Sequence, residues 1–329
     1  MLGRWTRLGW AISLCWPLVE CGPVPRKKRD NGQSPADQNQ VFYRRGDPED
    51  GADHTCRSGV EAEALILANR ARTAAGSPPF FCLDRLSAMA AGHAAFLAAN
   101  EVAARTDPHG ETPGLPYYSG ATLAARGDAA GLDRRAFWLS EGAGAGGSAA
   151  AIVAEHLATV YHRSHLLTPG GRYLAVAVAA QPGGASYAVL NSLAWVDVDS
   201  LAAVVYPGPG QTDVPCRFNA RRERPDPVPA LAAPGYPVSV HFPRYLIPGS
   251  ASEPQIAVRT FSLTEGTERR AVSLQLVKRP ADGEVAPSDA FLVPATPLAP
   301  QTRYQAHVTA SYGRFTVDRS WWFTTGDCN

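Results

Sequence analysis

The sequence predicts an α+β domain followed by an all-β sandwich. Between residues 58 and 161 apolar residues recur at helical spacing, and two strand-like segments follow directly. Beyond residue 197, short segments of alternating polarity are separated by proline-rich connections. A chain of 329 residues with 45% apolar residues is long enough for two such domains. The expected organisation is an export signal (1–21), a disordered linker (22–57), the α+β domain (58–197) and the sandwich (198–329).

The N-terminal residues have the composition of an export signal. Arg4 and Arg7 precede a nearly uncharged apolar run, Leu8–Val19, which at about a dozen residues is too short to span a bilayer. The alternative is a buried helix of the fold. Cys21 stands where a lipoprotein carries its acylated cysteine, although Glu20 replaces the small residue that normally precedes it. We expect an exported protein, periplasmic, cell-surface or secreted, which contacts a membrane only if Cys21 is lipidated.

Charge and composition exclude one class of partner. The net charge of +1 gives no general attraction to nucleic acid. The linker is poor in apolar residues, and its basic run Arg26–Arg29 is typical of a solvated tether. After the N-terminus no apolar stretch reaches the roughly 18 residues of a transmembrane helix, so the sequence does not predict an integral membrane protein.

Three helices are expected in the α+β domain. The first stops at a Gly-Ser-Pro-Pro run, which cannot continue a helix. The second has a single apolar stripe that includes His93, and this position predicts a hydrogen-bonded core histidine. The third is rich in Ala, Ile and Val. The helices are expected from Val60 to the stop at Gly76, from Asp84 to Asn100 and from Ala149 to Tyr161.

Strands are expected at the end of this domain and throughout the next one. Tyr173–Ala180 and Ser186–Val196 flank the turn signal Gln181–Gly184 and predict a hairpin. Helices packed on such an antiparallel pair define an α+β domain. The strands of the sandwich are expected at Val238–Phe242, Ile256–Leu263, Val272–Val277, Tyr304–Ala310 and Phe315–Thr325.

The cysteines fit an oxidising compartment. Cys15 and Cys21 belong to the predicted signal, and no C-x-x-C spacing suggests zinc binding or a redox pair. The four remaining cysteines allow three disulfide pairings. They are Cys56, Cys82, Cys216 and Cys328.

An ordered series of motifs covers about 140 residues of the α+β domain. It comprises Asn69-x-x-Arg72-x-x-x-Gly76-x-Pro78-Pro79, Leu86-Ser87-x-x-Ala90-x-x-His93-Ala94, Asp107-Pro108-His109-Gly110, Gly120-Ala121-Thr122, Gly131, Ser140-Glu141-Gly142 and Tyr161-His162-Arg163-x-x-Leu166-Leu167-x-Pro169. In this order the series resembles the bacterial form of the CAP superfamily, the family of cysteine-rich secretory, antigen 5 and pathogenesis-related proteins. The resemblance implies a CAP-like α-β-α sandwich with an antiparallel sheet.

The resemblance also implies a set of residues that line a cavity. It assigns His109, Glu141 and His162 to a common cleft, where they are the primary metal candidates. Glu141 is followed by Gly where the family has Asn, and a second glutamate found in many relatives has no secure equivalent. Glu155 is a weaker candidate for that position, because seven residues before His162 is nearly the same helix face. His165, one turn after His162, is a second weaker candidate.

The second domain resembles the bacterial Ig-like modules of surface proteins. The likeness depends on Tyr206-Pro-x-x-x-Gln211-Thr-Asp-Val214-Pro215, Leu298-Ala-Pro-x-Thr302-x-Tyr304 and Ser320–Thr325. It implies a spacer or adhesive unit and assigns no chemistry. With this organisation we expect the pairs Cys56–Cys82, near the first two helices, and Cys216–Cys328, at the two ends of the sandwich.

Two function classes remain open. Two imidazoles and one carboxylate suit a divalent metal such as zinc, or proton transfer. The first class is a binding protein that holds a lipid or other small ligand in the His/Glu cleft. The alternative is an extracellular or cell-wall hydrolase that uses the same cavity, with or without a metal. No G-x-S-x-G or H-E-x-x-H motif is present, and no catalytic residue is identified, which favours binding.

One glycine motif is set aside. Gly142-x-Gly144-x-x-Gly147 matches the dinucleotide-binding fingerprint but lacks a surrounding βαβ unit. We therefore interpret it as a flexible loop, and no nucleotide cofactor is expected.

Overall fold

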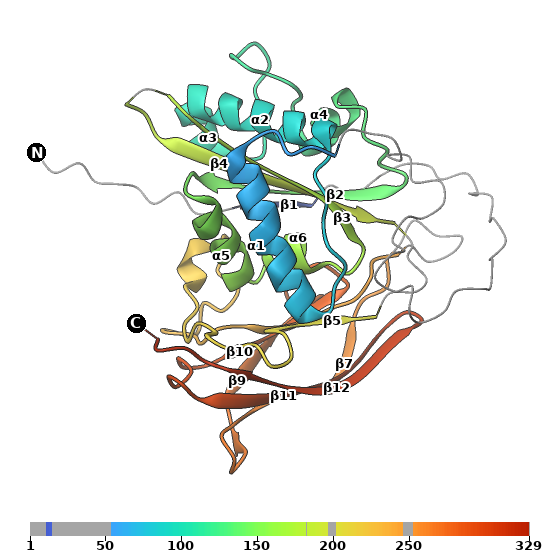
Figure 1. Ribbon diagram of the computed structural model, residues 1–329, viewed down its shortest axis with the longest axis vertical. Coiled ribbons are helices and arrows are strands. Elements are labelled where there is room, and N and C mark those ends of the chain that lie inside the picture. Colours follow the sequence, from blue (N-terminus) through green and yellow to red (C-terminus); the bar gives the residue numbers. More distant parts are fainter. Residues whose placement is uncertain (1–10, 15–53, 182, 197–201, 246–252, 329) are drawn as a thin grey trace, which may run out of the picture.

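The computed structural model describes residues 11–14, 54–181, 183–196, 202–245 and 253–328. Within them the chain forms two adjoining units, an α+β unit (residues 54–196, together with strand β1) and a β-sandwich unit (residues 202–328) (Figure 1). Cys21 and the basic run that follows it lie outside the described residues, as does most of the predicted signal and linker.

The α+β unit has three layers. Its sheet has the order β1-β2-β4-β3, with all neighbouring strands antiparallel. In Figure 1, helices α2, α3 and α4 lie above the sheet, and α1, α5 and α6 lie below it. The elements are β1 (Ala11–Leu14), α1 (Gly59–Ala75), α2 (Asp84–Ala99), α3 (Glu101–Thr106), α4 (Leu123–Ala129), β2 (Phe137–Ala145), α5 (Ala149–Ala158), α6 (Arg163–Leu167), β3 (Gly171–Ala180) and β4 (Ser186–Trp195).

The alternation of side chains along β3 separates the two cores of this unit. Tyr173 and Ala175 pack into the core on the α2 side, whereas Leu174 and Val176 pack into the core that contains α1 and α5. Successive residues of a strand point to opposite faces of its sheet, so a strand buried on both faces needs apolar residues at every position. The run from Tyr173 to Val176 meets that requirement.

The three helices predicted from the sequence are present, with small differences at their ends. Ser58 caps α1, where its Oγ accepts a hydrogen bond from the backbone N–H of Glu61 at 3.1 Å. Gly76 ends the same helix with φ 79°, a left-handed conformation that glycine adopts without a Cβ penalty. The third helix ends at Ala158, three residues before the predicted Tyr161.

The interpretation of residues 142–147 as a flexible loop was wrong for residues 142–145, and only residues 146 and 147 lie in a connection. Gly142 and Gly144 lie within β2, which pairs with β4 along its whole length and with β1 at residues 140–143. Glycine and alanine produce no alternation of polarity, so the strand had no signal in the sequence. Strand β1 itself comes from the predicted export signal, and its Ser13 is paired with Glu141.

The β-sandwich unit consists of two four-stranded sheets with the orders β5-β6-β10-β9 and β12-β11-β7-β8. All five strands predicted here are present with shifted ends, and β5, β8 and β10 were not predicted. Val240 and Leu292 of the first sheet share a core with Ala306 and Trp321 of the second. The strands are β5 (Val204–Tyr206), β6 (Val238–His241), β7 (Ala257–Glu265), β8 (Arg270–Ala271), β9 (Leu274–Val277), β10 (Asp289–Pro294), β11 (Arg303–Tyr312) and β12 (Phe315–Thr324).

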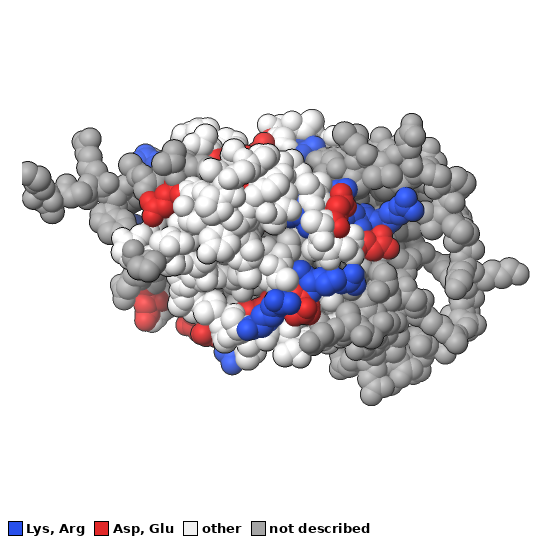
Figure 2. All heavy atoms as spheres, turned by 90° about the horizontal axis from the view of Figure 1, so that it is seen from above, with Lys and Arg blue, Asp and Glu red and all other residues white. Residues whose placement is uncertain are grey.

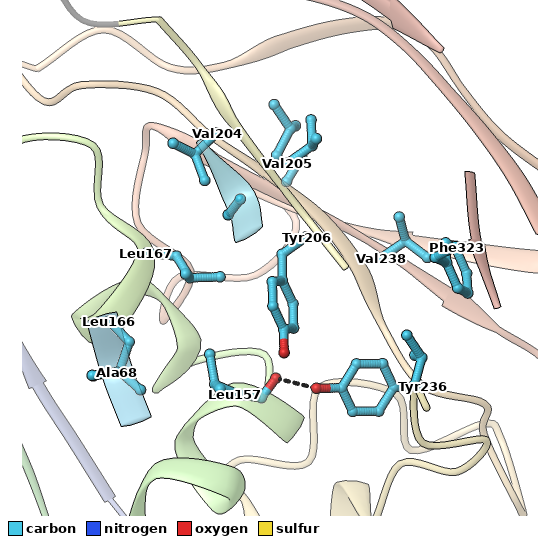
Figure 3. Packing of buried hydrophobic residues seen from close by; sticks show 14 of the residues in the cluster. Ala68, Leu157, Leu166, Leu167, Val204, Val205, Tyr206, Tyr236, Val238 and Phe323 are labelled. Carbon is cyan, nitrogen blue, oxygen red and sulfur yellow. Dashed lines mark hydrogen bonds between the residues drawn. The ribbon is translucent and has the colours of Figure 1, made fainter. Parts of the chain in front are cut away.

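The two units share one hydrophobic core. Ala68 of α1 and Leu167 of α6 belong to the same buried cluster as Val205 and Phe323 of the sandwich (Figure 3). The Tyr236 hydroxyl crosses the boundary and donates a hydrogen bond to the Leu157 carbonyl at 2.9 Å. The sandwich is therefore packed on the α+β unit and does not extend away from it as a separate stalk.

Two disulfides join the pairs predicted from the sequence. Cys56 and Cys82 have a Cα–Cα distance of 5.2 Å, and Cys216 and Cys328 one of 5.3 Å, both within the usual range for a disulfide. Disulfides of this kind are consistent with an exported protein. Among the described residues, no helix is long and apolar enough to cross a membrane.

Candidate functional site

Glu141 is a carboxylate buried in the middle of the α+β unit. It lies on β2, is 0% exposed, and accepts hydrogen bonds from three side chains. His109 Nδ1 donates to Oε1 at 3.0 Å, and Asn191 Nδ2 donates to Oε2 at 3.1 Å. The Arg126 guanidinium donates to both oxygens, at 2.8 and 3.0 Å. Glu141 is thus held as an ion by a charge-assisted contact in which one guanidinium nitrogen, Nη2 of Arg126, donates to both of its oxygens.

The surroundings of Glu141 keep it ionised. Burial by itself would raise the pKa of this carboxyl, because a charged group is poorly solvated in the interior. The charges of His93, Arg126 and His109 and the hydrogen bond from His109 outweigh that effect, so the pKa lies well below its usual range. A carboxylate in this state is a weak base whose lone pairs are occupied, and it is a poor general acid or base.

His93 connects this carboxylate to a second one, Glu111. Its Nδ1 lies 2.9 Å from Glu111 Oε1 and its Nε2 lies 3.0 Å from the Pro108 carbonyl and 3.6 Å from Glu141 Oε1. A carboxylate oxygen and a carbonyl oxygen both accept hydrogen bonds, so each ring nitrogen faces an acceptor. The core position predicted for His93 is confirmed, and the ring also links two buried carboxylates.

Three further histidines form a buried cluster beside this network. His156 lies on α5, His165 on α6, and His162 in the turn that joins them. Their ring centroids are 5.4 Å (156–162), 5.8 Å (162–165) and 6.0 Å (156–165) apart, and all three are at most 2% exposed. We call His156, His162 and His165 the imidazole cluster.

Burial keeps two members of the imidazole cluster neutral. It lowers the pKa of His156 to about 3, and the nearby charge of His162 contributes in the same direction. Burial likewise lowers the pKa of His165 well below its usual value. That pKa also responds to the charges of His109 and Glu141, so His165 lies within electrostatic range of the Glu141 network.

The residues predicted as metal candidates are only partly brought together. His109 and Glu141 are in contact, whereas the Nδ1 of His162 lies 3.5 Å from Glu223 of the sandwich unit. Their side chains are 10%, 0% and 1% exposed, so in this conformation they are buried and do not line an open cleft. Glu155 pairs with Arg222 at the surface, away from the predicted set.

The predicted trio does not form a preassembled metal site. Among the described residues, the one group of three or more metal-ligand atoms within 4.8 Å of one another is Cys56, Glu61 and Cys82. The two sulfur atoms of that group form a disulfide and cannot act as thiolate ligands. Any metal in the histidine region would therefore require side-chain rotation.

A serine, a histidine and an aspartate in the sandwich unit have the hydrogen-bond pattern of a catalytic triad. His241 Nε2 lies 2.9 Å from Ser239 Oγ, and His241 Nδ1 lies 2.9 Å from Asp289 Oδ2. Ser239 and His241 are 0% exposed and Asp289 is 1% exposed, so no substrate can reach the hydroxyl. Ser239 Oγ also accepts from Arg163, and Ser164 donates to Asp289. These contacts attach α6 to the sandwich, and we assign them a structural role.

Four residues that complete the site were not identified from the sequence. Glu111, Arg126 and Asn191 bind or neutralise the buried groups, and Glu223 reaches the turn before α6 from the other unit. The one signal available was the position of Glu111, two residues after His109. Comparison with known protein families and with curated sequences gives no match for this chain.

Glu223 attaches the sandwich to the turn that carries His162. Its two carboxyl oxygens accept the backbone N–H groups of Val160 and Tyr161, at 2.9 and 2.6 Å. Burial raises the pKa of Glu223 to about 8, although these two hydrogen bonds oppose the shift.

At pH 4, where this carboxyl is neutral in both the folded and the unfolded protein, replacing Glu223 with glutamine is expected to lower the free energy of unfolding by about 1–3 kcal/mol, because the amide NH2 replaces one of the two accepting oxygens and leaves a buried N–H unsatisfied. Urea denaturation measures the loss. Glu155→Gln is the matched control, since it removes only a surface pair with Arg222 and should change stability by less than about 1 kcal/mol. A similar small effect for both variants would contradict the proposed attachment.

Proposed function

We propose that this chain is an exported binding protein of the CAP type, in which the His/Glu centre of the α+β unit holds a small ligand and an Ig-like sandwich supports that unit. The proposal depends mainly on the hydrogen bonding of the buried Glu141 carboxylate. Its two oxygens accept four hydrogen bonds from the side chains of His109, Arg126 and Asn191. A carboxylate so occupied stabilises positive charge and fixes imidazole orientation, and both properties suit binding.

The hydrolase alternative receives less support. Hydrolysis needs a base or nucleophile that a substrate can reach, and the Ser239–His241–Asp289 group is fully enclosed. Glu141 cannot activate water while Arg126 and His109 occupy its oxygens. A ligand of the buried centre must also be small, since the side chains that surround Glu141 leave it 0% exposed.

Export is supported by the two disulfides and by the signal-like N-terminus.

The visible α2 side of the molecule is largely uncharged at its centre, with acidic and basic side chains at its margins (Figure 2). We propose no nucleic-acid partner, because such a partner would require basic side chains gathered on one face. The destination is the periplasm, the cell surface or the medium, and lipidation of Cys21 would attach the protein to a membrane.

Mass spectrometry of the native protein, purified from cells that export it, tests this function. We expect a mass above that of the polypeptide which is lost on denaturation, two disulfides, and an N-terminus generated by signal cleavage. An added acyl mass would place the N-terminus at Cys21. A ligand-free protein that still begins at Met1 would contradict both the binding function and export. Release of product from peptide or cell-wall substrates, abolished in Glu141→Gln, would favour the hydrolase.

A further inference from the structure

The spacing of the imidazole cluster resembles that of histidines around one metal ion. Three imidazoles that bind a tetrahedral zinc ion at about 2.0–2.1 Å have ring centroids about 5 Å apart. The three centroid distances here are 5.4, 5.8 and 6.0 Å. The centroid spacing is therefore within about 1 Å of that geometry, and the rings must also rotate to direct one nitrogen each at a shared ion.

The protonation of the cluster suits metal binding. A histidine must be neutral to act as a ligand, and a hydrogen bond from one ring nitrogen determines which nitrogen carries the lone pair. His156 Nδ1 donates to the Ile152 carbonyl at 2.8 Å, which leaves Nε2 as its ligand atom. Neither ring nitrogen of His165 has a hydrogen-bond partner among the described residues, although this side chain is 2% exposed. Buried polar groups are normally satisfied, so an unsatisfied imidazole indicates that a partner is missing.

A glycine makes room for the His156 ring. A Cβ at Gly142 would lie 2.5 Å from His156 Nε2, closer than real Cβ atoms approach other heavy atoms. The expected ligand atom of His156 is therefore in contact with β2, next to Glu141. Any larger residue at position 142 would push the ring out of the cluster.

Glu223 of the β-sandwich unit lies beside the imidazole cluster. His162 Nδ1 lies 3.5 Å from Glu223 Oε1, and carboxylate–histidine pairs of this kind orient metal-binding histidines. The neighbouring guanidinium of Arg163 is directed elsewhere, to the Pro237 carbonyl and Ser239 Oγ. Glu223 is thus placed to accept a hydrogen bond from His162, and a cation bound nearby would favour the charged form of this carboxyl.

We propose that His156, His162 and His165 bind one divalent transition-metal ion, zinc in the first instance, and that Glu223 orients His162 in this site. Metal entry requires rotation of the rings, because their nitrogens do not all converge within 4.8 Å in the present conformation. This ligand set differs from His109, Glu141 and His162, the set expected from the sequence. The proposal rests on the binding function above and identifies its ligand.

Cobalt(II) titration of metal-stripped, folded protein tests the site, because tetrahedral cobalt has intense visible absorption bands and zinc can then displace it. We expect one equivalent to bind in the wild type. His165→Gln and His156→Gln should each weaken binding by more than about tenfold. His307→Gln is the control and should leave the affinity and the spectrum unchanged, because His307 is a partly exposed histidine of the sandwich unit that pairs with Asp318.

A pair of glycine variants keeps the test independent of histidine replacement. Gly142→Ala should weaken cobalt binding by about tenfold, because the added Cβ displaces His156 from its position. Gly92→Ala is the control, since a Cβ at that site has nothing within 4 Å. Circular dichroism of each variant establishes that it is folded, and affinities are compared among folded variants.

The outcomes separate this inference from the binding function. Unchanged affinity in both His165→Gln and Gly142→Ala, or an equal loss in His307→Gln, would overturn the three-histidine site. An organic molecule that co-purifies with a protein unable to bind cobalt would overturn the metal site and leave the binding function standing. If no ligand of either kind binds, both fail.

Discussion

Replacing Arg126 with methionine should lower the free energy of unfolding by about 3–5 kcal/mol, which is typical of a buried ion pair that loses one partner. Arg126 and Glu141 are both at most 1% exposed. Nη2 of Arg126 donates hydrogen bonds to both carboxylate oxygens of Glu141. Methionine retains most of the apolar volume but leaves the Glu141 carboxylate without its main neutralising charge. Arg126 also donates to the His109 and Gly120 carbonyls, and those bonds are lost too.

A double-mutant cycle separates charge from packing. Glu141→Gln alone should also destabilise the protein, but Arg126→Met combined with Glu141→Gln should lose less than the sum of the two single changes. Arg134→Met is the matched control, because its partner Asp128 is 59% exposed and surface pairs contribute at most about 1 kcal/mol. Urea denaturation with the disulfides intact provides the measurement. Additive losses, or a loss for Arg126→Met no greater than for Arg134→Met, would contradict an essential ion pair.

Acid should destabilise the metal-free protein well above the pH at which exposed carboxylates are protonated. His156 has a pKa of about 3 in the folded protein and an ordinary value of 6.5 when unfolded. Between these limits the unfolded state binds the additional proton, so stability falls by about 1.4 kcal/mol for each unit of decreasing pH. His165 acts in the same direction over a range below 6.5. The contribution of His156 alone reaches about 3 kcal/mol near pH 4.

Glu223 produces the opposite dependence. Its pKa is raised from 4.5 to about 8 on folding, so its contribution is fully present below pH 4.5 and is lost as the pH rises toward 8. Stability should therefore be greatest near pH 6.5, where the histidine contribution is complete and the Glu223 penalty is partial. Denaturation midpoints measured from pH 4 to pH 9 test this. His156→Gln should flatten the acid side alone, and a profile identical to that of the wild type would contradict the assigned pKa.

The sequence was informative where a pattern is local. The helices ending at Gly76 and near Asn100, and the hairpin around residues 181–184, follow from spacing and turn residues over short stretches. The pairing of Cys216 with Cys328 followed from the domain organisation. The mixed α+β class is correct, and the CAP and Ig-like resemblances remain proposals.

The arrangement of the site could not be predicted in the same way. Arg126 reaches Glu141 because α4 lies beside β2, and Glu223 reaches His162 because the two units share a core. Contacts of this kind depend on packing between distant segments, and no spacing in the chain encodes them. Strand β2 was missed for a different reason, since its glycines and alanines carry no periodic signal.

The contact between Gly208 and α1 has a consequence for the history of the two units. A Cβ at Gly208 would lie 2.3 Å from the Ala74 carbonyl oxygen, so the backbone that enters the sandwich touches the backbone at the end of α1. A β-sandwich exchanged by recombination would have to arrive with a glycine at this position and with apolar partners for Ala68 and Leu167. The boundary between the two units is therefore a poor junction for shuffling, and the two units should be inherited together.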